Sequence, residues 1–103
     1  MPVNLSLMQP RWAGAVGVMA YGQCRAAETI TVPGTSTLTA QNGEIMLVTS
    51  TEAAAVQIAT GTTPDAAATV QTALTTARMA LEPLSTQVVY PNTGDKINIK
   101  AFV

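Results

Sequence analysis

The acidic side chains are the first candidates for chemistry, because the chain has no histidine. Asp65 and Asp95 lie in the turn-like sequences Thr-Pro-Asp and Thr-Gly-Asp, and their carboxylates together with threonine hydroxyls could in principle bind calcium. Aspartate also occupies turns for local backbone reasons, and the chain lacks the alternating acids of a calcium loop. We therefore expect Asp65 and Asp95 to be turn residues and expect no metal site.

Two glutamates could form a carboxylate pair for general acid-base catalysis. Glu44 begins a predicted strand and Glu52 lies in a predicted loop, and no apolar pocket is evident that would shift either pKa. A chain with no histidine and one cysteine cannot form Cys/His zinc sites or Ser/His or Cys/His nucleophile pairs. Residues 61–64 contain glycine but lack the further glycines and the lysine of a phosphate-binding loop. We expect no enzyme activity and no cofactor.

Cysteine and aromatic residues are few. Cys24 is single, so it is either a free thiol or one half of an intermolecular disulfide. The four aromatic residues could stack on sugars or bases, but in a chain of small residues they are more often anchors of a core or an interface. They are Trp12, Tyr21, Tyr90 and Phe102.

The composition indicates one small domain with an unusually uncharged surface. The chain has 103 residues, of which 48% are hydrophobic and only 11% are charged, and its formal net charge is −1. Five basic residues against six acidic ones leave no basic patch for nucleic acid, and no apolar run is long enough to span a membrane. A surface with so few charges resists association poorly, so we expect a partner to cover much of it.

The candidate residues named above are expected to be positioned by strands. From residue 28 onward, short runs of β-branched and apolar residues recur between turn signals, which is typical of an all-β chain. Residues 44–49 alternate with apolar side chains on both faces, which predicts a central strand. Residues 96–103 have the clearest alternation, with Ile97 and Ile99 on one face and Lys96 and Asn98 on the other. A turn is expected at 41–43. The predicted strands are 29–32, 36–40, 44–49, 54–60, 86–90 and 96–103.

Residues 61–84 are open to two interpretations. Thr63 and Pro64 would suit the start of a helix, and apolar residues then recur with helical spacing from Val70 to Leu81. Four threonines inside that stretch oppose a helix, because their β-branched side chains lose rotamer freedom there. The segment is either one short helix or a long loop rich in alanine and threonine.

The first 27 residues differ from the rest. They combine scattered apolar residues with the glycine-bearing apolar stretch 13–20 and show no self-contained fold pattern. We expect residues 1–27 to be an extended arm that packs on another chain and residues 28–103 to be a β-sandwich. The expected anchors of the arm are its larger apolar and aromatic residues, Leu5, Leu7, Trp12, Val16, Val18 and Tyr21.

Four pieces of the chain resemble a group of small tailed-bacteriophage virion proteins. They are residues 30–35 (ITVPGT), 42–48 (NGEIMLV), 56–66 (VQIATGTTPDA) and 91–100 (PNTGDKINIK). In that group a strand followed by Gly-Thr-x-Pro-x-Ala and a Gly-Asp-Lys-Ile turn occur on compact β-sandwiches attached to heads or tails. The resemblance implies an all-β sandwich or jelly roll and brings no catalytic residues with it.

The resemblance and the composition together predict a non-enzymatic structural protein of a phage virion, specifically a capsid decoration or cement protein. Its expected partners are the major capsid protein or other virion proteins and further copies of itself, and its expected location is the phage particle. A tail or head-fibre component is the alternative within structural proteins. A carbohydrate-binding module would need exposed aromatic residues near loop tips, and a secreted inhibitor would need the arm to be cleaved.

Overall fold

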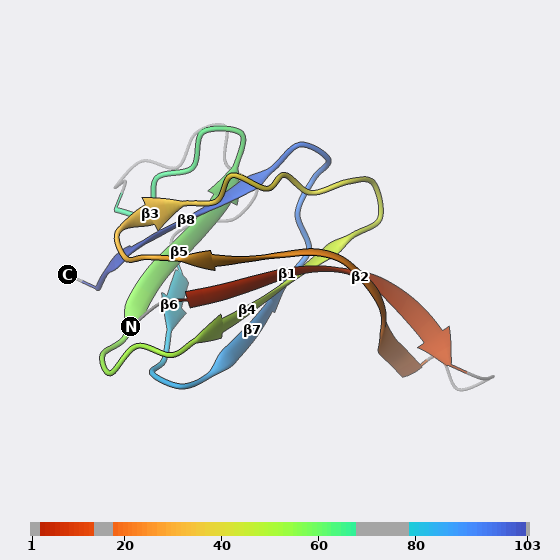
Figure 1. Cartoon of the computed structure of the whole chain (residues 1–103), viewed down its shortest axis with the longest axis horizontal. Helices are drawn as coiled ribbons and strands as arrows, with labels where there is room; N and C mark the ends of the chain where they lie inside the picture. Colours follow the sequence, from red (N-terminus) through yellow and green to blue (C-terminus); the bar gives the residue numbers. More distant parts are fainter. Residues whose placement is uncertain (1–2, 14–17, 68–78, 103) are drawn as a thin grey trace.

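The polypeptide folds into two antiparallel four-stranded sheets that pack face to face (Figure 1). This computed structural model describes residues 3–13, 18–67 and 79–102. Sheet A has the strand order β2-β1-β4-β7, and sheet B has the order β3-β8-β5-β6. The all-β sandwich predicted from the strand spacing is confirmed.

The strands of sheet A come from the beginning, the middle and the last fifth of the chain. They are β1 (Val3–Ala13), β2 (Val18–Ile30), β4 (Ile45–Ser50) and β7 (Thr86–Val89). The strands of sheet B are β3 (Gly34–Thr35), β5 (Val56–Gly61), β6 (Met79–Leu81) and β8 (Lys96–Ala101).

The core lies between the sheets and is built by the period-two alternation of their strands. In β8, Ile97 and Ile99 are fully buried, as the alternation predicts, and Lys96 and Lys100 on the other face are half-buried. Asn98 on that face is buried as well, which the alternation did not predict. The strand predicted at 44–49 is confirmed as central, because β4 pairs with β1 on one side and β7 on the other. The buried apolar cluster comprises Val3, Leu5, Leu7, Ile30, Ala40, Met46, Val48, Val56, Ile58, Leu81, Val89, Ile97 and Ile99.

The first strand corrects the sequence-based view of the chain's beginning. Residues Val3 to Met8 pair with β4 as well as with β2, so this part of β1 is an interior strand of sheet A. Leu5 and Leu7 are 0% exposed and belong to the chain's own core. The expectation that these two leucines anchor a contact with another chain is therefore wrong, and β2 runs continuously through the expected boundary between residues 27 and 28.

Two further expectations differ from the structure. Residues 36–40 form an irregular connection between the sheets rather than a strand, and Ser36 and Ala40 donate backbone hydrogen bonds to Ile97 and Asp95. Residues 62–67 and 79–84, at the two ends of the possible helix, are not helical, and residues 68–78 lie outside the described residues. The part of the chain that the structure describes contains no helix long and apolar enough to cross a membrane.

Candidate assembly site at the base of the β1–β2 ribbon

The paired strands β1 and β2 continue beyond the sandwich. Pairing of β1 with β4 ends at Met8, whereas pairing of β1 with β2 continues to Ala13 and Val18. We call residues 9–13 and 18–23 the β1–β2 ribbon. It projects from the body along the long axis of the molecule, whose extents are 43 × 29 × 23 Å (Figure 1). Pro10 is tolerated there because β1 no longer lies between two strands.

Two register shifts bend β2 where the ribbon leaves the body. Leu7 pairs with Ala26 but Met8 pairs with Cys24, which leaves Arg25 as an extra residue on β2. A second extra residue of β2 falls between the pairs formed by Met8 and Pro10. Such bulges bend the bulged strand, increase its twist and re-aim a side chain. Here the re-aimed side chain is that of Arg25.

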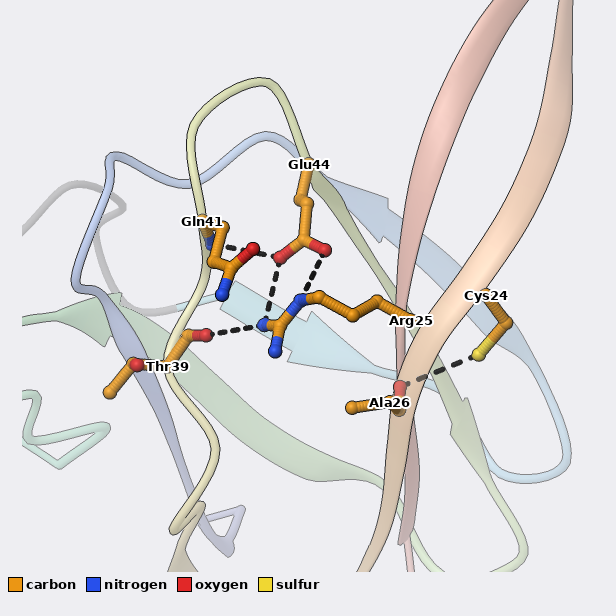
Figure 2. A network of polar contacts seen from close by, with 6 residues as sticks. All are labelled: Cys24, Arg25, Ala26, Thr39, Gln41 and Glu44. Atoms are coloured by element: carbon orange, nitrogen blue, oxygen red, sulfur yellow. Dashed lines mark hydrogen bonds and ion pairs between the residues drawn. The ribbon is translucent and has the colours of Figure 1, made fainter.

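Arg25 reaches from the bulge to a buried carboxylate on the connection that precedes β4 (Figure 2). Its Nε donates to Glu44 Oε2 at 2.6 Å, and its Nη2 donates to Glu44 Oε1 at 3.0 Å. The same Nη2 donates to the carbonyl oxygen of Thr39 at 2.8 Å. This two-point geometry matches the planar guanidinium to the carboxylate, so it fixes orientation as well as distance.

The turn before β4 holds Glu44 in place. The backbone nitrogen of Glu44 donates to the carbonyl oxygen of Gln41, and the backbone nitrogen of Gln41 donates to Glu44 Oε1 at 2.8 Å. Gly43, at the third position of this turn, has φ +79°, a conformation that favours glycine. The turn predicted at 41–43 is confirmed, but it joins an irregular segment to β4 rather than two paired strands.

The ion pair keeps Glu44 charged. The hydrogen bonds from Arg25 lower the pKa of the Glu44 carboxyl, the bond from the Gln41 backbone adds to this, and burial opposes it. The same contact raises the pKa of Arg25. A carboxyl with a lowered pKa is ionised at neutral pH and has no proton to give as a general acid. Glu44 and Glu52 also lie at opposite ends of β4, so the structure does not bring this pair together.

A second glutamate joins β2 to the same connection. The carboxylate of Glu28 accepts hydrogen bonds from the backbone nitrogens of Thr37 and Leu38 and from the hydroxyl of Thr37, at 3.0 to 3.1 Å. Arg25 and Glu28 thus attach residues 37–44 to β2, which is one of the two edge strands of sheet A. The two contacts fix the base of the ribbon relative to the body.

Three of the remaining predicted anchors lie in the ribbon. Trp12, Val18 and Tyr21 belong to its strands, where the structure describes the backbone and not the side chains, and Val16 lies outside the described residues. Cys24 at the base is a free, exposed thiol whose Sγ lies 3.4 Å from the carbonyl oxygen of Ala26.

The two aspartates considered for calcium lie in separate environments. Asp65 binds Lys100 Nζ at 2.7 Å on the surface, and this contact lowers the pKa of Asp65. Asp95 is buried and accepts a hydrogen bond from the backbone nitrogen of Asn92. Among the described residues no group of three or more cysteine and acidic side chains is placed to hold a metal ion.

Two aromatic side chains among the described residues are exposed, and they lie on either side of β8 in the chain. Tyr90 is 68% exposed and lies before β8, whereas Phe102 is 52% exposed and lies after it. The intervening residues are a turn at 91–95 and the six residues of β8.

The outer face of sheet B contains a buried polar cluster beneath residues 62–67. Asn98 Oδ1 accepts a hydrogen bond from the backbone nitrogen of Ala66 at 2.8 Å, and Asn98 Nδ2 donates to Gly34 and Thr35. Gln57 lies on the same face of the neighbouring strand and is 1% exposed. Its Oε1 has no hydrogen-bond partner among the described residues. These contacts hold the connection after β5 against the sheet.

Sequence reasoning did not single out Arg25 or Glu28. Neither residue lies in a recognisable motif, and Arg25 and Glu44 are 19 residues apart. The one sequence signal for these two residues is that both are charged in a chain with few charges, and this signal does not identify their partners. Comparison with known proteins adds no further guide: no protein-family model, curated protein or solved structure gave a significant match to the chain.

Proposed function

We propose that the protein is a non-enzymatic structural subunit of a tailed-phage virion that binds the major capsid protein as a decoration protein of the head. The observation that carries this proposal is the β1–β2 ribbon, which extends by four residue pairs beyond the last contact with β4 and is fixed at its base by the Arg25–Glu44 ion pair. The assignment to a phage particle rests on the resemblance of residues 30–103 to phage virion proteins.

The ribbon is suited to contact a larger surface. An isolated two-stranded ribbon is marginally stable in water, so it gains stability when a partner covers it. The bidentate contact of Arg25 with Glu44 restricts the direction in which the ribbon leaves the body, which lowers the entropy lost on binding. A fixed, projecting ribbon is therefore a better docking element than a free arm of the same sequence.

The low charge indicates how the contact is stabilised. Of the chain's residues only 11% are charged, and described pairs such as Asp65–Lys100 are already used within the chain. Exposed ion pairs contribute only about 0.2 to 1 kcal/mol each, whereas burial of about 1,600 Å² of fitted surface supports stable association. The proposed contact therefore depends on burial and is insensitive to salt.

The test uses purified heads from a phage from which the gene for this chain has been deleted. Wild-type chain is mixed with these heads, and the bound fraction is measured by sedimentation. We expect saturable binding that persists in about 1 M sodium chloride, where the screening length is about 3 Å. Absence of binding, or release by salt alone, would overturn the proposal.

Two matched variants locate the contact. Trp12→Ala, in the ribbon, is expected to weaken binding at least about tenfold, because large aromatic residues dominate interface energetics. Tyr90→Ala removes an exposed aromatic residue of the body and should leave binding unchanged. The reverse pattern would show that the body, and not the ribbon, contacts the head.

A further inference from the structure

The outer edge of the ribbon is an unpaired strand edge. β2 ends the strand order of sheet A, so β1 is its one partner among the described strands. Close to the body this edge is occupied, because Arg25 and Glu28 bind residues 37–44 alongside it. Residues 18–23 continue the edge beyond those contacts. Their outward backbone groups are a template for another strand.

The two edges of the ribbon differ in sequence. Residues 9–13 of β1 include Pro10 and Arg11, and both proline and charge are devices that discourage pairing at an exposed edge. Residues 18–23 of β2, with the sequence VMAYGQ, contain neither proline nor charge. Only the β2 edge is therefore left open to a further strand.

We propose that residues 18–23 pair antiparallel with the same residues of a second copy of the chain, giving a ribbon with the strand order β1-β2-β2-β1. Antiparallel pairing of identical edges is the pattern that a two-fold axis produces, and it closes both open edges at once. It also turns a marginal two-stranded ribbon into a four-stranded one. The uncharged sequence brings no like charges together across the axis.

This dimer does not depend on the proposed place of the protein on a phage head. Six paired residues on each chain form a small interface, so we expect association in the micromolar range. The full-length chain is therefore studied alone by sedimentation equilibrium between about 1 and 500 μM. Failure to dimerise would leave head binding unaffected, and failure to bind heads would leave the dimer unaffected.

Charge substitutions at Ala20 and Tyr21 test the geometry, because antiparallel pairing of residues 18–23 with the same residues of a second copy places Ala20 of each chain opposite Tyr21 of the other. The double variant Ala20→Glu/Tyr21→Glu should weaken dimerisation at least about tenfold, because it places like charges directly opposite each other. Ala20→Glu/Tyr21→Lys places opposite charges at the same positions and should dimerise at least about tenfold more tightly than the variant with two glutamates. Ala27→Lys, at an exposed position of the same strand within the body, is the matched control and should dimerise like the wild type.

Hydrogen exchange provides a measurement that needs no variant. Amide exchange of residues 18–23 in the wild-type chain should slow as the concentration rises through the dimerisation range, while exchange of β8 should not change. A wild-type chain that stays monomeric up to 500 μM would overturn the proposal. This holds also if the edge instead binds a strand of a different protein. A dimer weakened by Ala27→Lys and not by Ala20→Glu/Tyr21→Glu, or exchange at 18–23 independent of concentration, would also overturn it.

Discussion

Replacement of Ile99 by alanine is the sharpest test of the sandwich itself. Ile99 is 0% exposed and lies in β8, where its neighbours across the sheet are Gly34 on one side and Ile58 on the other. Its side chain contributes to the core that joins the two sheets. If β8 is integral to the fold, Ile99→Ala must lower the free energy of unfolding substantially.

The expected size of this loss follows from the burial of Ile99. The substitution removes three carbon atoms from a fully buried site, which at about 0.8 kcal/mol for each buried methylene is about 2.4 kcal/mol. The cavity left between two packed sheets adds to this, so we expect a total loss of about 3 to 4 kcal/mol. For a domain of this size the whole free energy of unfolding is about 5 to 15 kcal/mol, so the loss is a large fraction of it.

Urea unfolding followed by circular dichroism measures the loss. With a urea dependence of about 1.5 kcal/mol per molar, the midpoint should fall by about 2 M while the slope stays constant. Ile99→Val should cost only about 0.5 to 1.5 kcal/mol, and Leu84→Ala, at a side chain 76% exposed, about 0.5 or less. A loss below about 1 kcal/mol for Ile99→Ala would refute the placement of β8 in the core.

Three other substitutions test the polar contacts. Since the pKa of Glu44 is lowered by Arg25, the stabilisation it provides is complete above the ordinary value of 4.5 and is lost as the pH falls through the lowered one. Glu44→Gln should therefore reduce stability at pH 7 and flatten its decline between pH 5 and 2; equal acid slopes in urea melts would contradict the ion pair's role. Asn98→Ala should cost about 1 to 3 kcal/mol in the same assay, because it leaves the buried backbone nitrogen of Ala66 without its partner, and an effect below about 0.5 kcal/mol would be inconsistent with that contact. Gln57→Met should be neutral or stabilising, since it removes a buried oxygen that has no hydrogen-bond partner among the described residues; a loss above about 1 kcal/mol would count against this reasoning.

Local features of the sequence predicted a good part of the fold. The alternation around Ile97 and Ile99 identified β8 and its buried face, and apolar residues on both faces at 44–49 identified β4 as central. The turn at Gly43 was predicted from residue types that tolerate a positive φ. Each of these signals depends on neighbours within a few residues, and strand alternation and turn chemistry are local properties of the chain.

Tertiary structure decided the rest, because it depends on partners that are distant in the sequence. Val3 to Leu7 alternate apolar and polar residues, a local strand signal that the sequence-based interpretation overlooked, but their interior position follows only from pairing with β4, with Val3 opposite Ser50. Arg25 acquired its role from a bulge, which is defined only once two strands have a register. Glu44 was expected at the start of a strand, but its partner was set by the connection that brings it back beside β2. A sequence specifies which residues favour a strand or a turn, whereas the order and register of strands follow from burying all the apolar faces together.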